Sequence, residues 1–296
     1  MDPQLILQSV ISGLLQGSVY AVLALAFSII YMTTRTINFA QGQQLMVGAF
    51  IYYALQVGVG LPFPLALLGA VLASILIGLV VERAALRPLG QFDPNTNIGW
   101  ILTTLALGLI FQDLMRLIAG TDQRTVPAVV ESIGGRTAIS GIDIQKYLIF
   151  VIGIALALVL EALHRKSKLG RALRATAHDR NTAALMGINP QFMVLYSFGL
   201  AGALAAIAGW LIVPVTFLNL DMGTFTGLKA FAGAVVGGIG STRGALVGGL
   251  VVGLAESSTV LFQAQQWGNA LVFALLIVIL MVKPTGILGD ALIEKV

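Results

Sequence analysis

Few residues in this sequence have the types and spacing that catalysis requires. The only two histidines, His164 and His178, do not lie in H-E-x-x-H or any other metal-ligand spacing. The absence of cysteine excludes a thiolate nucleophile, a disulfide and a Cys-based zinc site. Neither a G-x-x-x-x-G-K-[ST] loop nor a G-x-S-x-G elbow occurs. The sequence therefore indicates a protein that is not an enzyme, binds no metal or cofactor, and hydrolyses no ATP through a Walker A loop of its own.

Ionisable residues inside apolar segments are candidates for function, because an unpaired charge is costly in a membrane. Asp113 and Arg116 are three residues apart in one segment, so they can pair with each other. Glu256 is the one acid well inside an apolar run, and the sequence shows no evident partner for it. Two interpretations stay open: an inter-helix hydrogen bond, which is favoured, and a proton relay.

The elements that carry these residues belong to a membrane protein. Of the 296 residues, 57% are hydrophobic and 10% are charged, whereas a soluble domain carries roughly 25% charged residues. The mean hydropathy is +0.93. The net charge of +4 comes from basic residues beside apolar segments, where they orient topology, so nucleic acid is excluded as a partner. We expect one domain over residues 1–296, and a retained helix rather than a signal peptide at its start.

Apolar runs of about 20 residues predict an all-α integral membrane protein with about eight transmembrane helices. The stretch 224–241 is too short and too rich in glycine to span comfortably, and it contains Lys229. Broken backbone at membrane depth is tolerated where protein or a water-filled cavity covers it, so we expect a re-entrant half-helix there. The eight runs are 4–31, 42–58, 62–82, 98–118, 146–163, 190–213, 243–262 and 267–283.

The polar loops predict the orientation. Residues 164–180 hold six of the 17 Lys and Arg residues, so the loop over about 164–190 is expected in the cytoplasm. The charge-balanced loop over about 119–145 is expected outside, with a hairpin turn near Gly134 and Gly135. The side on which the N-terminus lies stays open. GxxxG-like spacing at Gly244 and Gly248, and at Gly249 and Gly253, predicts close helix packing.

The basic loop has the pattern of a folded knob. Arg171, Arg174 and His178 share one helix face. Asp179 is placed to cap a second short helix, Asn181 to Met186, which Gly187 can terminate. A solvated loop that only sets topology would not need these caps, or the small residues that accompany them. The loop is therefore predicted to fill a groove on a partner protein, helped by Ala175, Ala183 and Ala184.

A resemblance to a known family supports this interpretation. The string GRALRATAHDRNTAALMGIN resembles the cytoplasmic coupling loop of ABC importer membrane subunits, in the form found in branched-chain amino acid permeases of the LivH type. Further stretches match in the same order, so the resemblance covers nearly the whole chain. They are GSVYAVLALAFSIIY, TINFAQGQQLMVGAF, ERAALRPLG, GLKAFAGAVVGGIGSTRGALVGGLVVGLAE and KPTGILG.

The resemblance implies a multi-pass subunit of the inner (plasma) membrane with several partners. These are a related, LivM-like second permease, two cytosolic ATPase subunits that use ATP and Mg, and a periplasmic or extracellular substrate-binding protein. It also implies that coupling to the ATPases involves Arg171, Arg174, Ala175, Asp179, Ala183 and Gly187.

A translocation path is expected between residues 37–48 and 224–241. Members of the family commonly show INFAHGE, whereas Gln41 and Gln43 stand here in place of the His and Glu. Amides both donate and accept hydrogen bonds, so they suit a path for a polar solute. The equal alternative is that they only satisfy broken backbone at a helix start. The candidate residues are Asn38, Phe39, Gln41, Gly42, Gln43, Gln44, Lys229, Gly237 and Gly238.

The expected function is a permease subunit of a binding-protein-dependent ABC importer for branched-chain or other amino acids, driven by ATP hydrolysis in partner subunits. The same family also serves urea and short amides. An alternative of another class is an ion-coupled secondary transporter or channel for a small polar solute, for which Glu256 offers thin support. A scaffold without transport would explain neither the glycine-rich segment nor the polar 37–44 stretch.

Overall fold

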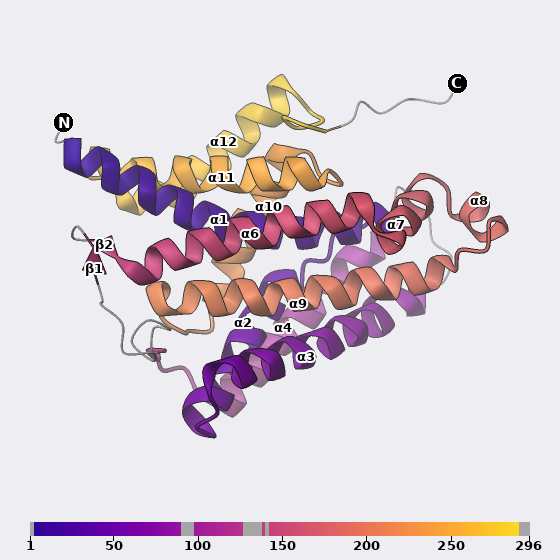
Figure 1. The fold of residues 1–296 in the computed structure, drawn as a ribbon, viewed down its shortest axis with the longest axis horizontal. Helices are drawn as coiled ribbons and strands as arrows, with labels where there is room; N and C mark the ends of the chain where they lie inside the picture. Colours follow the sequence, from indigo (N-terminus) through magenta and orange to yellow (C-terminus); the bar gives the residue numbers. More distant parts are fainter. Residues whose placement is uncertain (1–2, 90–97, 127–137, 140–141, 290–296) are drawn as a thin grey trace.

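The structure is a computed structural model that describes residues 3–89, 98–126, 138–139 and 142–289. Its long helices run along one common direction (Figure 1). The short helices α7 (Lys168–His178) and α8 (Arg180–Leu185) lie at one end of this bundle, and the two-residue strands β1 (Ala138–Ile139) and β2 (Ile142–Asp143) lie at the other. Because α7 and α8 carry the basic loop, we call their end the inner end and the opposite end the outer end. The start of α1 lies at the outer end.

Among the residues that the structure describes, seven helical segments are long and apolar enough to cross a membrane, against the eight runs expected. They contain α1 (Pro3–Thr34), α3 (Phe63–Val81), α4 (Gly99–Ala119), α6 (Ile144–Lys166), α9 (Pro190–Thr216), α11 (Thr242–Ser258) and α12 (Gly268–Val282). The eighth run, 42–58, forms the 13-residue helix α2 (Gln41–Tyr53) and a π-helical turn, Ala54–Gly58. At 1.5 Å per residue, α2 is about 20 Å long, which is shorter than the hydrocarbon core of about 30 Å.

The glycine-rich segment forms the half-length helix α10 (Met222–Gly237), as expected, but the chain does not return to the side from which it came. Leu218, before α10, exchanges backbone hydrogen bonds with Arg124, which follows α4 at the outer end. Arg243, after α10, donates to Glu161 near the inner end of α6, with 3.1 Å between Nε and Oε1. The stretch is therefore a crossing made by a short helix with an irregular segment at each end, rather than a re-entrant one.

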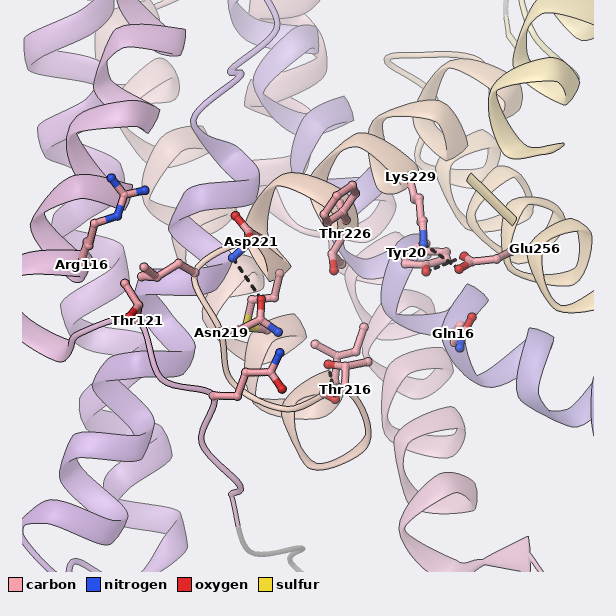
Figure 2. A pocket seen from close by; sticks show the side chains of 15 residues that line it. Gln16, Tyr20, Arg116, Thr121, Thr216, Asn219, Asp221, Thr226, Lys229 and Glu256 are labelled. Carbon is pink, nitrogen blue, oxygen red and sulfur yellow. Dashed lines mark hydrogen bonds and ion pairs between the residues drawn. The ribbon is translucent and has the colours of Figure 1, made fainter. Parts of the chain in front are cut away.

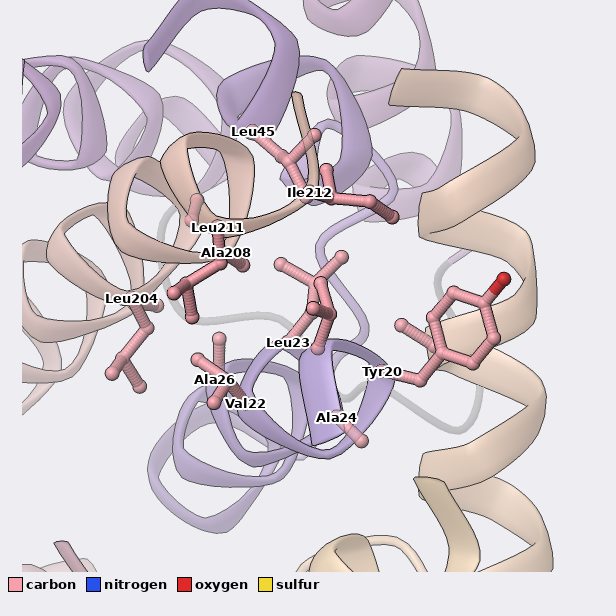
Figure 3. Packing of buried hydrophobic residues seen from close by; sticks show 14 of the residues in the cluster. Tyr20, Val22, Leu23, Ala24, Ala26, Leu45, Leu204, Ala208, Leu211 and Ile212 are labelled. Carbon is pink, nitrogen blue, oxygen red and sulfur yellow. The ribbon is translucent and has the colours of Figure 1, made fainter. Parts of the chain in front are cut away.

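Helix α1 occupies the middle of the bundle. Every residue from Ser18 to Ile30 is buried, and the cluster in Figure 3 joins this part of α1 to Leu45 of α2 and to residues of α9 such as Leu204 and Ile212. A helix that is buried all round contacts both halves of the bundle. A displacement of α1 would therefore change its contacts with the helices on every side of it.

Close contacts between helices rest on glycine, as the GxxxG-like spacing predicts. A Cβ on Gly253 would lie 2.4 Å from the Gly13 carbonyl oxygen of α1, and one on Gly249 would lie 2.3 Å from the Ala21 nitrogen. On the other side of α11, a Cβ on Gly248 would lie 2.0 Å from the Gly233 carbonyl oxygen of α10. The packing role of these glycines is confirmed.

Several expectations fall outside the described residues. They concern the hairpin turn at Gly134 and Gly135 and two charged residues of the outer loop, Glu131 and Arg136. The strands β1 and β2 pair antiparallel at the end of this loop, with Ala138 opposite Asp143.

Candidate functional site

The basic loop folds as two short helices, of which the sequence predicts the second with its cap at Asp179; the cap of the first, at Ser167, was not predicted. Ser167 caps α7, because its hydroxyl accepts a hydrogen bond from the Gly170 N–H at 2.9 Å. Asp179 caps α8: its Oδ1 accepts from the N–H groups of Asn181 at 2.8 Å and Thr182 at 3.1 Å. Gly187 follows α8 with a φ of +80°, a conformation that L side chains rarely adopt. We call residues 167–189 the coupling knob.

The coupling knob is fastened to the inner ends of two membrane helices. Arg180 donates from its guanidinium to the Thr33 carbonyl oxygen near the end of α1. Arg35 donates back to the Ala177 carbonyl oxygen at 3.0 Å. Arg174 donates to the carbonyl oxygens of His164 and Arg165 at the end of α6. The knob is therefore bonded directly to the inner ends of α1 and α6.

The residues expected to face a partner lie in different surroundings. Arg171, Asp179 and Gly187 are exposed, whereas Ala183 is buried. Arg174 donates its hydrogen bonds to the carbonyl groups of α6. The tip of α8 instead presents Leu185 and Met186, which are 87% and 79% exposed. In Figure 1 α8 projects beyond the membrane helices.

A second region of interest lies where the N-terminal turns of α2 and α10 meet. A Cβ on Gly42 would lie 2.3 Å from the Gly223 carbonyl oxygen and 3.0 Å from the Gly227 Cα, so glycine is required for this approach. Gln43 donates from Nε2 to the Thr224 hydroxyl at 2.8 Å. Two broken segments thus meet backbone to backbone inside the protein.

The amide side chains before and within α2 are buried and mostly engaged with one another or with backbone. Asn38 donates to the Gln41 Oε1 at 3.2 Å and accepts from the Ala40 N–H at 3.1 Å. Gln41 donates to the Ala201 carbonyl oxygen of α9 at 2.9 Å. The bond to the Ala40 N–H matches the alternative in which the amides satisfy broken backbone, whereas Gln41 bonds a carbonyl oxygen inside the continuous helix α9. Both side-chain polar atoms of the buried Gln44 have no hydrogen-bond partner among the described residues.

The other residues proposed for a path are dispersed. The Phe39 ring packs against Trp100, with 6.3 Å between ring centroids, and against Phe231, with 5.9 Å. Gly237 and Gly238 lie at the inner end of α10, where Leu288 and Ile287 donate backbone hydrogen bonds to Gly237 and Val236. Of the nine proposed residues, Lys229 lines the cavity described next.

A cavity of about 540 Å³ opens in the outer half of the bundle, at the start of α10 (Figure 2). Its walls come from five helices and two connecting segments. Gln16 and Tyr20 belong to α1, Lys229 to α10 and Glu256 to α11, and Thr121 marks the side toward the outer loop. The volume is in the range of small-molecule binding sites, about 300–1,000 Å³.

Charged side chains converge in the wall of this cavity. Lys229 Nζ lies 2.6 Å from Glu256 Oε1, and these side chains are 13% and 18% exposed. The Tyr20 hydroxyl donates to the other carboxylate oxygen, Oε2, at 2.7 Å. Figure 2 shows the three side chains, from three helices, pointing toward one another. We call Tyr20, Lys229 and Glu256 the charged triad.

Sequence reasoning identified Glu256 and Lys229 separately but did not join them. They are 27 positions apart, on helices whose mutual orientation the sequence does not show. The interpretation of Glu256 as an inter-helix bonding partner is confirmed. Tyr20 was missed altogether, and the usable signal was a tyrosine inside a long apolar run, where its hydroxyl needs a partner.

Comparisons with known proteins agree over almost the whole length of the chain. Residues 9–280 match the family model described as the permease component of branched-chain amino acid transport systems. The high-affinity branched-chain amino acid transport system permease protein BraD of Pseudomonas aeruginosa is 34% identical, over 98% of each chain. The LivH protein of Salmonella typhimurium is 31% identical over 98% of this chain and 97% of its own. A probable LivH of Methanocaldococcus jannaschii is 30% identical over 94% and 90%.

Proposed function

Because this chain belongs to the family of branched-chain amino acid transport permeases, we propose that it carries branched-chain or other amino acids across the membrane within a binding-protein-dependent ABC importer. It is a multi-pass permease subunit of the inner membrane and not itself an enzyme. Permeases of this kind work with ATPase and substrate-binding partners. The finer composition that we propose is two ATPase subunits that use ATP and Mg, and a related, LivM-like second permease.

The observation that carries the proposal is the coupling knob. Its caps at Ser167 and Asp179 fix two short helices beyond the membrane-spanning bundle, and its exposed apolar tip is Leu185 and Met186. Exposed apolar side chains at the end of an otherwise basic loop suit a groove on a cytosolic partner. We propose that Arg171, Asp179 and Gly187 help to present this tip, with the small side chain of Ala175 allowing close approach and the buried Ala183 packing inside the knob.

The proposed mechanism runs from the knob to the interior of the bundle. Closure of the ATPase subunits displaces the knob, and the arginine contacts of Arg180 with Thr33 and of Arg35 with Ala177 carry this displacement to α1. Helix α1 also bears Tyr20 in the cavity wall, so the two regions are connected through one continuous helix. The path itself is proposed between residues 37–48 and 224–241, where the broken segments meet.

Co-purification tests this assignment. The tagged chain is extracted from its native membranes in mild detergent, and its companions are identified by mass spectrometry. We expect two ATPase subunits and a second permease. A double substitution of the tip, Leu185→Asp with Met186→Asp, is expected to release the ATPases while the second permease stays bound. Recovery of the chain alone, under conditions that preserve known importers, would contradict the proposal.

The ion-coupled alternative gains a partner for Glu256 in Lys229, but the family relationship does not favour it. The two readings differ in their energy source. An ion-coupled transporter would accumulate solute in liposomes without ATPase subunits.

A further inference from the structure

The cavity in the outer half of the bundle has an ion pair in its wall. Its charged triad presents a cation and an anion side by side, and both charges are largely withdrawn from solvent. A buried ion pair is weak evidence for stability, since apolar residues of similar volume often serve a fold as well or better. Within membrane-spanning segments, ionisable residues are instead a default sign of function.

Apolar side chains also line the cavity, among polar ones such as Arg116, Asn219 and Asp221. Ile212 near the end of α9, Leu220 and Met222 before and at the start of α10, and Phe225 one turn later line the same space as the triad. Phe225 is 52% exposed, so core packing covers only part of this side chain. A cavity lined by a charged pair and by aliphatic and aromatic groups matches a ligand that carries both opposite charges and an apolar side chain.

We propose that this cavity binds a zwitterionic aliphatic amino acid, with Lys229 contacting its carboxylate and Glu256 its ammonium group. The 2.6 Å pair between Lys229 and Glu256 is then the form without ligand. A zwitterion that enters between them replaces one ion pair with two, so both side chains keep a partner of opposite charge. An uncompensated charge never arises during the exchange.

Tyr20 has a positioning role in this site. Its hydroxyl holds Glu256 Oε2 at 2.7 Å, which leaves Oε1, the oxygen now on Lys229, to receive an ammonium group. The side chain of the ligand contacts the apolar lining residues, of which Phe225 is the most exposed. The proposal rests on the importer function given above and deepens it, because a cavity reached near Thr121 and Gln123 faces the side from which a binding protein delivers its cargo.

The test uses the complete importer complex in lipid nanodiscs, without its binding protein. Because this chain has no cysteine, Thr226→Cys places a single reactive thiol in the cavity wall. Its rate of alkylation, read by mass spectrometry of the labelled peptide, is measured with leucine, with 4-methylpentanoate, which lacks the ammonium group, and with 3-methylbutylamine, which lacks the carboxylate. Gln16→Cys supplies a second reporter in the same cavity.

Leucine is expected to protect the thiol, and each analogue to need a concentration on the order of tenfold higher or more for equal protection. With Lys229→Met, the advantage of leucine over the amine should disappear. With Glu256→Gln, its advantage over the carboxylate should disappear. The matched control is Glu161→Gln, because Glu161 is a similarly shielded carboxylate, 14% exposed and paired with Arg165, at the inner end; it should leave protection intact.

Equal protection by leucine and its analogues at both reporters, or protection unaffected by Lys229→Met and Glu256→Gln, would overturn the site and leave the triad as a structural clamp. The same complexes and variants are also reconstituted into proteoliposomes with the binding protein, where ATP-driven leucine uptake is measured. Uptake without protection refutes the site alone. An absence of uptake with all partners present refutes the importer function on which the site rests.

Discussion

Removing the cap of α8 tests the role of the coupling knob with a single side chain. Asp179 accepts three hydrogen bonds in the first turn of α8: two from backbone N–H groups, at 2.8 and 3.1 Å, and one from the Thr182 hydroxyl at 3.0 Å. Loss of such a cap costs about 1 kcal/mol. Since α8 has only six residues, few other hydrogen bonds hold it, and about 1 kcal/mol changes the ratio of folded to unfolded helix roughly fivefold.

The variant Asp179→Ala should therefore speed hydrogen exchange of residues 181–186 by roughly fivefold, and lower uptake relative to ATP hydrolysis in the reconstituted importer. Asp179→Asn is the matched control, because asparagine caps a helix about as well as aspartate. It should keep both properties near those of the parent. Unchanged exchange and uptake in Asp179→Ala, or equal losses in both variants, would refute the argument that the cap orders the knob.

Three further outcomes are expected. Gly42→Ala should destabilise the protein by about 1–3 kcal/mol in denaturation assays, because its Cβ would meet the Gly223 carbonyl oxygen at 2.3 Å; Gly58→Ala, where nothing lies within 4 Å, should not. Gly187→Ala should cost about 1 kcal/mol because φ is +80°, with Gly187→Asn tolerated better, and equal thermal shifts for both would contradict this. Arg180→Met should raise hydrogen exchange over 168–185, by freeing the knob from α1, and unaltered exchange would show that the contact is dispensable.

Local signals carried most of what the sequence predicted correctly. The caps at Asp179 and Gly187 depend on residues within a few positions, and the structure confirms them. The long apolar runs form long helices through a local effect as well, because a helix makes its backbone hydrogen bonds within its own segment. The glycine-rich stretch forms a short helix, as predicted. The prediction that the chain returns to the same side was wrong, because the path of a broken segment depends on the helices packed around it.

Relationships between helices were beyond the sequence. The pairing of Lys229 with Glu256 depends on how α10 and α11 face each other, and Tyr20 joins them from a helix more than 200 positions away along the chain. Arg174 shares a helix face with Arg171 in the sequence, yet its long side chain turns back to the carbonyl groups of α6. The partners of the Asn38 and Gln41 amides were likewise hidden, because the Ala201 carbonyl that Gln41 contacts lies 160 positions away along the chain.

The most direct test of the central claim is ATP-dependent uptake of leucine into proteoliposomes. The chain is reconstituted once with its co-purified ATPase subunits, second permease and binding protein, and once alone. The expected result is uptake that requires ATP and every partner, and that falls with Asp179→Ala but not with Asp179→Asn. Uptake by the chain alone, driven by an ion gradient and indifferent to ATP, would contradict the account.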